Sequence, residues 1–125
     1  MTVARKIYVV LTALFLVLLP VQFLLVGYGL FGGDLDVHMA FGMTVLHGLM
    51  LLMAITAAVA RMWKLAGLSL LMFVVVFVQV ALTEVDSAWI AGLHPLIAFL
   101  YWPFTYFLLW RPVRGEATSL TPGIA

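Results

Sequence analysis

The sequence contains no cysteine and few charged side chains. Without cysteine, the chain can form no disulfide bonds, no zinc sites built on thiolates and no iron–sulfur clusters. Only 9% of the 125 residues are charged, whereas 66% are hydrophobic, and the mean hydropathy is +1.25. A water-soluble domain of this length needs far more polar surface, because most of its residues face solvent. The composition therefore predicts a protein whose solvent is lipid.

The sequence also lacks the residue patterns that accompany common catalytic chemistry. It has no serine, histidine and acid at the spacing of a catalytic triad, no phosphate-binding loop and no pair of carboxylates within an apolar run. The net charge of +1 comes from basic residues spread in pairs, so we expect no nucleic-acid partner. These absences leave open whether the protein is an enzyme.

Four apolar runs occupy residues 7–31, 37–60, 65–82 and 93–110. A helix crosses the apolar core of a bilayer in about 20 residues, so each run is long enough to span it. The first run is too long for the apolar region of a signal peptide, so we interpret it as a retained span. Short connections favour antiparallel neighbours. We expect an all-α integral membrane four-helix bundle of up-down-up-down topology, with one domain at residues 1–114 and a flexible tail at 115–125.

Local signals refine the bounds of these helices. Pro20 and Pro103 lie inside the first and fourth runs, where a proline bends a helix. Asp34 or Asp36 is a suitable N-cap for the second helix. The sequence Arg111-Pro112 is expected to end the fourth helix.

The charged residues separate into two groups along the chain. The basic residues precede the first run, follow the second and follow the fourth; they are Arg5, Lys6, Arg61, Lys64, Arg111 and Arg114. Four of the five acids lie in the two other connections; they are Asp34, Asp36, Glu84 and Asp86, and Glu116 is the exception. Lysine and arginine near span ends are retained in the cytoplasm. We therefore expect a multi-pass membrane protein with both termini in the cytoplasm.

Two of the three histidines, His38 and His94, begin the second and fourth runs at matching depth. In an up-down bundle these helices are diagonal, and neighbouring axes about 8–10 Å apart give a diagonal of about 11–14 Å. Two inward imidazoles and two metal–nitrogen bonds of about 2 Å span that distance. The alternative is that both histidines cap helix ends at the membrane interface and bind no ligand.

Small residues lie one helical turn below each of these histidines. Gly42 follows His38 on the same face, and Ala98 follows His94, which leaves room for the edge of a flat macrocycle such as a porphyrin. The aromatic residues expected as walls are Phe23, Phe31, Phe41 and Phe99. Asp34 or Asp36 is a candidate acceptor for a hydrogen bond from His38 that fixes its tautomer.

His47 comes nine residues after His38, so a regular α-helix places the two on opposite faces. We expect His47 to form an interhelical hydrogen bond with Gln22 or Gln79. Met39, Met43 and Met50 accompany it at helical spacing, and thioethers with an imidazole suit copper(I), so a metal site at His47 is the alternative. Contact with a second haem or a quinone is also open. In the fourth run, His94, Ala98, Tyr101 and Thr105 mark the inward face.

Three short segments carry a resemblance to known proteins. Residues 21–29 (VQFLLVGYG), 37–42 (VHMAFG) and 93–98 (LHPLIA) resemble a family of small bacterial four-span membrane proteins of unknown function. This resemblance implies that the protein resides in the bacterial cytoplasmic (inner) membrane. More distantly, His-x-x-x-Gly and the paired helix-end histidines resemble four-helix membrane haem proteins of the cytochrome b and haem A synthase type. That resemblance implies haem b held by His38 and His94 as the ligands of its iron.

The sequence thus predicts a small b-type haem-binding membrane protein that serves in electron transfer, sensing or haem handling. The alternative is a non-catalytic accessory or assembly subunit of a larger membrane complex. Expected partners are the lipid bilayer and, in addition, a larger membrane complex or further copies of the chain.

Overall fold

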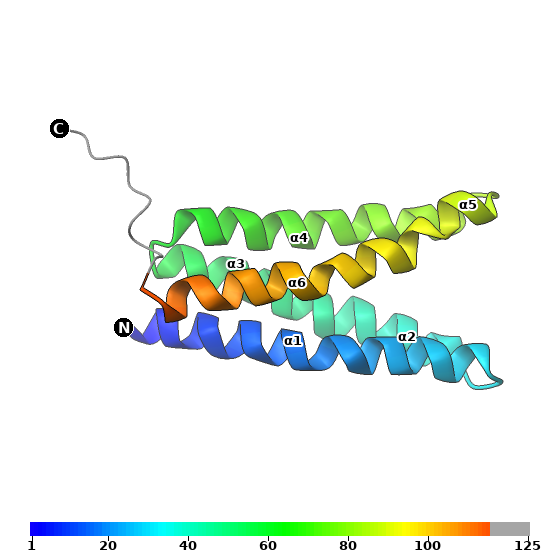
Figure 1. Ribbon diagram of the computed structural model, residues 1–125, viewed down its shortest axis with the longest axis horizontal. Coiled ribbons are helices and arrows are strands. Elements are labelled where there is room, and N and C mark those ends of the chain that lie inside the picture. The colour runs from blue at the N-terminus through cyan, green and yellow to red at the C-terminus, as the bar shows by residue number, and fades with distance from the viewer. Residues whose placement is uncertain (116–125) are drawn as a thin grey trace.

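The computed structural model describes residues 1–115, and that part of the chain is helical with no strand (Figure 1). The helices are α1 (Val3–Leu30), α2 (Leu35–Phe41), the π-helix η1 (Gly42–Leu46), α3 (His47–Val59), α4 (Trp63–Ala81), the 3₁₀ turn η2 (Leu82–Glu84), α5 (Ala88–Ala91) and α6 (Leu93–Val113). The predicted all-α four-helix bundle is confirmed. The tail predicted at residues 115–125 lies, beyond residue 115, outside the described residues.

Four helical stretches within residues 1–115 are long and apolar enough to cross a membrane. They are Val3–Leu30, Leu35–Val59, Trp63–Glu84 and Ala88–Val113. The first begins before its predicted start, and the fourth extends beyond its predicted bounds at both ends. All other ends agree closely with the predicted spans. The protein is therefore a multi-pass membrane protein.

The structure identifies the residue that caps the start of α2 and corrects the predicted end of α6. Asp34 is the N-cap of α2, and its side chain accepts a hydrogen bond from the backbone N–H of Asp36 at 2.8 Å. The expected stop at Arg111-Pro112 is wrong, because α6 continues to Val113. Pro112 is buried there, and its carbonyl accepts a hydrogen bond from the Arg5 guanidinium of α1, which ties the two helices together.

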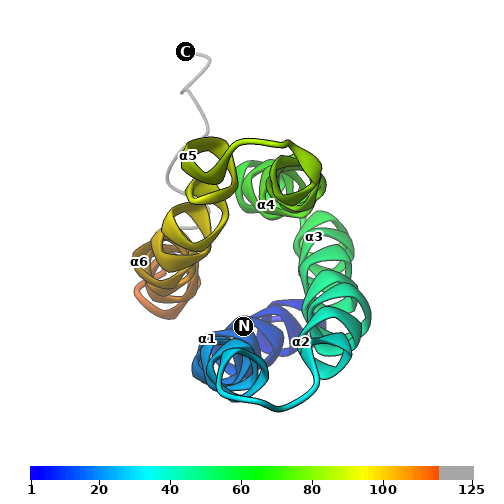
Figure 2. The same cartoon turned by 90° about the vertical axis from the view of Figure 1, so that its right-hand side faces the viewer.

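Looking along the bundle, the four spans follow one another in the order α1, α2–α3, α4 and α6 (Figure 2). Helix α6 contacts both α1 and α4, so it closes the ring. The span containing α2 and α3 is thus diagonal to α6, as the sequence predicts. Figures 1 and 2 both show α6 crossing the bundle obliquely, from beside α1 at one end to beside α4 at the other.

The two ends of the bundle differ in charge and in packing. We call the end with Arg5, Arg61 and Arg111 the basic end, and the end with Asp34 and Asp86 the acidic end. The fully buried side chains concentrate in the basic half; they include Tyr8, Thr12, Phe15, Met53, Ala57, Ser69, Thr105 and Leu108. Large apolar side chains on the outer faces are exposed, as expected where lipid replaces water. The basic half therefore contains most of the tightly packed core, and the acidic half is less densely packed.

Candidate cofactor site

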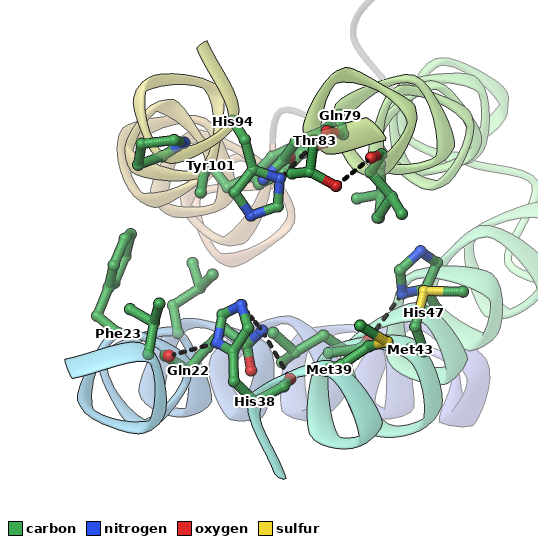
Figure 3. A pocket seen from close by; sticks show the side chains of 18 of the residues that line it. Gln22, Phe23, His38, Met39, Met43, His47, Gln79, Thr83, His94 and Tyr101 are labelled. Carbon is green, nitrogen blue, oxygen red and sulfur yellow. Dashed lines mark hydrogen bonds between the residues drawn. The ribbon is translucent and has the colours of Figure 1, made fainter. Parts of the chain in front are cut away.

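A cavity of about 320 Å³ lies in the acidic half, and all four spans contribute to its walls. This volume is at the lower end of the range for small-molecule sites, about 300–1,000 Å³. The polar residues that line it are Gln22, His38, His47, Gln79, Thr83, His94 and Tyr101 (Figure 3). All three histidines of the chain therefore line one cavity.

His38 is held by the backbone of the neighbouring helix α1. Its Nδ1 lies 3.1 Å from the carbonyl oxygen of Gln22. A carbonyl oxygen only accepts hydrogen bonds, so Nδ1 carries the proton, and the neutral ring presents the lone pair of Nε2. The predicted partners, Asp34 and Asp36, do not take this role, because Asp34 caps α2.

His94 is held in the same way by the other helical hairpin. Its Nδ1 lies 3.1 Å from the carbonyl oxygen of Gln79 on α4, which again leaves the lone pair on Nε2. Sixteen residues separate Gln22 from His38, and fifteen separate Gln79 from His94. Each hairpin thus carries one Gln–His pair, a correspondence that the sequence pattern had not revealed because the bond goes to the glutamine backbone.

The His38 and His94 rings face each other across the cavity (Figure 3). Their centroids are 6.5 Å apart, and their planes are inclined by 67°. Figure 3 shows a nitrogen of each ring directed toward the other ring. The matching depth and the convergence predicted for these two residues are therefore present in the structure.

This geometry suits one metal centre between two imidazoles. Two metal–nitrogen bonds of about 2 Å, with the distance from each nitrogen to its ring centre, add up to a centroid separation of roughly 6 Å. A backbone carbonyl on Nδ1–H is the usual support of a ligating histidine. No three or more His, Cys, Asp or Glu side chains within residues 1–115 are grouped to hold a metal ion. His38 and His94 are thus the two side chains placed to hold a metal-containing group between them, and a group that brings its other metal ligands with it, such as haem, would need no more than these two.

Gln22 also contacts His38 through its side chain. The Gln22 amide nitrogen lies 3.1 Å from the carbonyl oxygen of His38 and 3.3 Å from its Nε2. A Cβ at Gly42 would lie 2.7 Å from the same amide nitrogen. Gly42 and Ala98 both line the cavity as predicted, but the space above Gly42 accommodates the Gln22 amide.

His47 shares the cavity with His38, which contradicts the prediction that the two lie on opposite faces. The cause is the π-helix η1, in which the His47 N–H bonds to the carbonyl of Gly42, five residues earlier. The wider turn rotates the residues that follow it relative to a regular α-helix. The expected hydrogen bond to Gln22 or Gln79 is absent within residues 1–115. His47 Nδ1 instead lies 2.7 Å from the same Gly42 carbonyl, and its Nε2 has no partner in that range.

The other lining residues agree in part with prediction. Met39, Met43 and Met50 line the cavity with His47, and Ala98 and Tyr101 line it from α6. Of the expected aromatic walls, Phe23 lines the cavity, whereas Phe31 is 93% exposed and Phe99 is 63% exposed. Phe41 packs against the core instead. The prediction that Phe31, Phe41 and Phe99 form walls of the cavity is therefore wrong, because their side chains point elsewhere.

Residues 22–86 match a family of unknown function (DUF6220), over just more than half of the chain. The matched segment contains Gln22, His38, His47 and Gln79, and it ends before His94. No curated protein and no solved structure matches the chain.

Proposed function

The chain belongs to the DUF6220 family of unknown function, and we propose from the geometry of its site that it is a b-type haem protein of the membrane. The observation that carries this proposal is the opposed pair His38 and His94. Both rings border the same space at a centroid distance of 6.5 Å, and both are fixed at Nδ1 by a backbone carbonyl. The Gln22 amide nitrogen also lies 3.3 Å from Nε2 of His38. Capping a helix end requires no such convergence of two rings from diagonal spans.

The proposed role is one-electron transfer. Bound haem supplies an iron that changes between the ferric and ferrous states. His38 and His94 would hold it, and the carbonyls of Gln22 and Gln79 would orient the two rings through Nδ1. Most of the other residues that line the cavity are apolar, among them Met50 and Val76. Sensing and haem handling use the same ligand set and are the related roles.

We further propose that the protein resides in the bacterial cytoplasmic membrane with both termini in the cytoplasm. The support is the charge distribution, because every lysine and arginine belongs to the basic end. In this orientation the His38–His94 pair lies toward the outer face. The alternative role, an accessory or assembly subunit of a larger complex, requires no haem, so the same experiment decides between them.

The test is the absorption spectrum of the purified full-length protein after expression with ample haem supply. We expect a Soret band and split α and β bands in the wild type. His38→Ala and His94→Ala would each remove one of the two proposed ligands of the iron, so each should abolish or convert the split bands.

The matched control is His47→Ala, which removes the third histidine of the same cavity and leaves both proposed ligands in place. We expect its haem spectrum to persist. Wild-type protein that carries no Soret absorbance despite ample haem overturns the proposal and favours the accessory-subunit role.

A further inference from the structure

Three residues that line the cavity carry a buried acceptor atom with no hydrogen-bond partner within residues 1–115, namely Gln22, His47 and Gln79. Gln22 lies beside His38, whereas the acceptors of His47 and Gln79 are separate from the proposed haem ligands. His47 is 6% exposed, and its Nδ1–H donates to the carbonyl of Gly42, so its Nε2 carries a lone pair. That Nε2 has no hydrogen-bond partner within residues 1–115. The Oε1 of Gln79, a residue that is 5% exposed, has none in the same range. A polar atom without a partner in an apolar environment is costly and calls for an explanation.

Both atoms accept hydrogen bonds, and that restricts the ligand. In this tautomer the His47 ring has no proton to give at Nε2. Tyr101 contributes no free donor either, because its hydroxyl donates to the carbonyl of Met72 at 3.5 Å. A ligand that bonds to both of these acceptors must therefore bring its own hydroxyl or N–H donors.

The position of His47 separates this part of the cavity from the His38–His94 pair. His47 follows His38 by nine residues, which is about two and a half helical turns toward the middle of the membrane. The surrounding walls are apolar, with Met50 and Val76 lining the cavity and the Phe77 ring 5.2 Å from the imidazole. The site therefore lies at the depth of the lipid chains.

The cavity is bordered by α1 and α6, the two spans that diverge toward the acidic end (Figure 2). Figure 3 shows Phe23 of α1 on that side and His47 on the opposite wall. A molecule that enters between α1 and α6 comes from the bilayer, so the ligand must dissolve in lipid.

We propose that His47 and Gln79 bind the head group of a lipid-soluble quinol. A quinol combines a flat ring, two hydroxyl donors and an apolar tail, and one hydroxyl donates to His47 Nε2. The oxidised quinone carries only carbonyl acceptors and offers no proton to that nitrogen. The bond to His47 therefore favours the reduced form. Neither His47 nor the Gln79 side chain is a haem ligand in the function proposed above, so the two proposals can fail separately.

The experiment measures binding to the full-length protein in detergent micelles under anaerobic conditions. The probes are decylubiquinol and its dimethyl ether, which keeps the ring and tail and removes both hydroxyl donors. We expect the wild type to bind the quinol about tenfold more tightly than the ether, the effect of one good buried hydrogen bond. His47→Leu should abolish this preference.

Two further variants separate hydrogen bonding from a general loss of structure. His47→Gln restores an acceptor and should recover part of the preference for the quinol. Thr44→Val is the matched control, because Thr44 is exposed, bonds to the carbonyl of Ala40 and does not line the cavity. It should keep the full preference.

Equal affinity of the wild type for the quinol and its ether, or an unchanged preference in His47→Leu, overturns the quinol site. So does the absence of any quinol binding. The titration is performed with haem-loaded and haem-depleted protein. Protein that takes up haem but in its haem-depleted form binds no quinol refutes this site alone. Protein that never acquires haem but binds the quinol refutes the haem proposal alone.

Discussion

The side chain of Gln22 should compete with a metal for His38, and Gln22→Leu tests this directly. The Gln22 amide nitrogen lies 3.3 Å from His38 Nε2, the atom proposed to ligate iron. Leucine removes that contact and the 3.1 Å bond to the His38 carbonyl, but it keeps the backbone carbonyl that orients the ring through Nδ1. The substitution therefore frees the ligand atom without releasing the ring.

The magnitude follows from hydrogen bonds measured in membrane proteins, which average about 0.6 kcal/mol and reach about 1.7 kcal/mol. Removing one such competitor should tighten haem binding by about three- to twentyfold. The apo protein loses two bonds, so the free energy of unfolding should fall by about 1–2 kcal/mol. Affinity and stability should thus change in opposite directions.

The assay is a titration of haem-depleted protein with haem, followed at the Soret band. Gln79→Leu is the matched control, because Gln79 also orients a histidine through its carbonyl, but its side chain makes no hydrogen bond to His94. We expect haem affinity to stay near that of the wild type in this control. Weaker binding by Gln22→Leu, or no change, would refute the competition.

Two predictions concern the rest of the molecule. Gly42→Ala introduces a Cβ 2.7 Å from the Gln22 amide nitrogen and must displace the Gln22 side chain. Alanine also stabilises a helix by about 1 kcal/mol relative to glycine, so we expect the two effects to cancel. Thermal unfolding in detergent should then show almost no change in stability. A clear stabilisation would show that the contact is unimportant. Cysteines introduced at Asp34 and Ser87 should react with an impermeant thiol reagent on intact cells, whereas one at Thr2 should not; the reverse labelling pattern would invert the proposed topology.

Sequence reasoning succeeded for the architecture because lipid imposes strong and simple rules. An apolar run of sufficient length must become a helix, since only a helix satisfies its own backbone in hydrocarbon. The depth of His38 and His94 followed from the same rule, as did the inward face of α6 marked by Tyr101 and Thr105. Both of these residues are buried.

The register of His47 was not predictable in this way. A regular 3.6-residue period separates His38 and His47 by half a turn, and the π-helix that cancels this separation is stabilised by two bonds to one carbonyl, that of Gly42. The presence of a glycine in the sequence does not by itself predict a π-helical turn. Gln22 and Gln79 were recognised as polar residues within spans, yet their decisive atoms are backbone carbonyls, which every residue possesses.

The Gln–His pairs also bear on how the protein assembles. Each histidine is oriented by a residue of its own hairpin, so a hairpin inserted in the membrane fixes its imidazole from local contacts alone. The spacing between the two rings is set later, when the hairpins associate side by side. The turn at Arg61 connects the two halves but orients neither ring. The site therefore forms when two hairpins associate, each with its histidine already oriented. A chain cleaved at the Arg61 turn keeps both Gln–His contacts, because each contact lies within one hairpin.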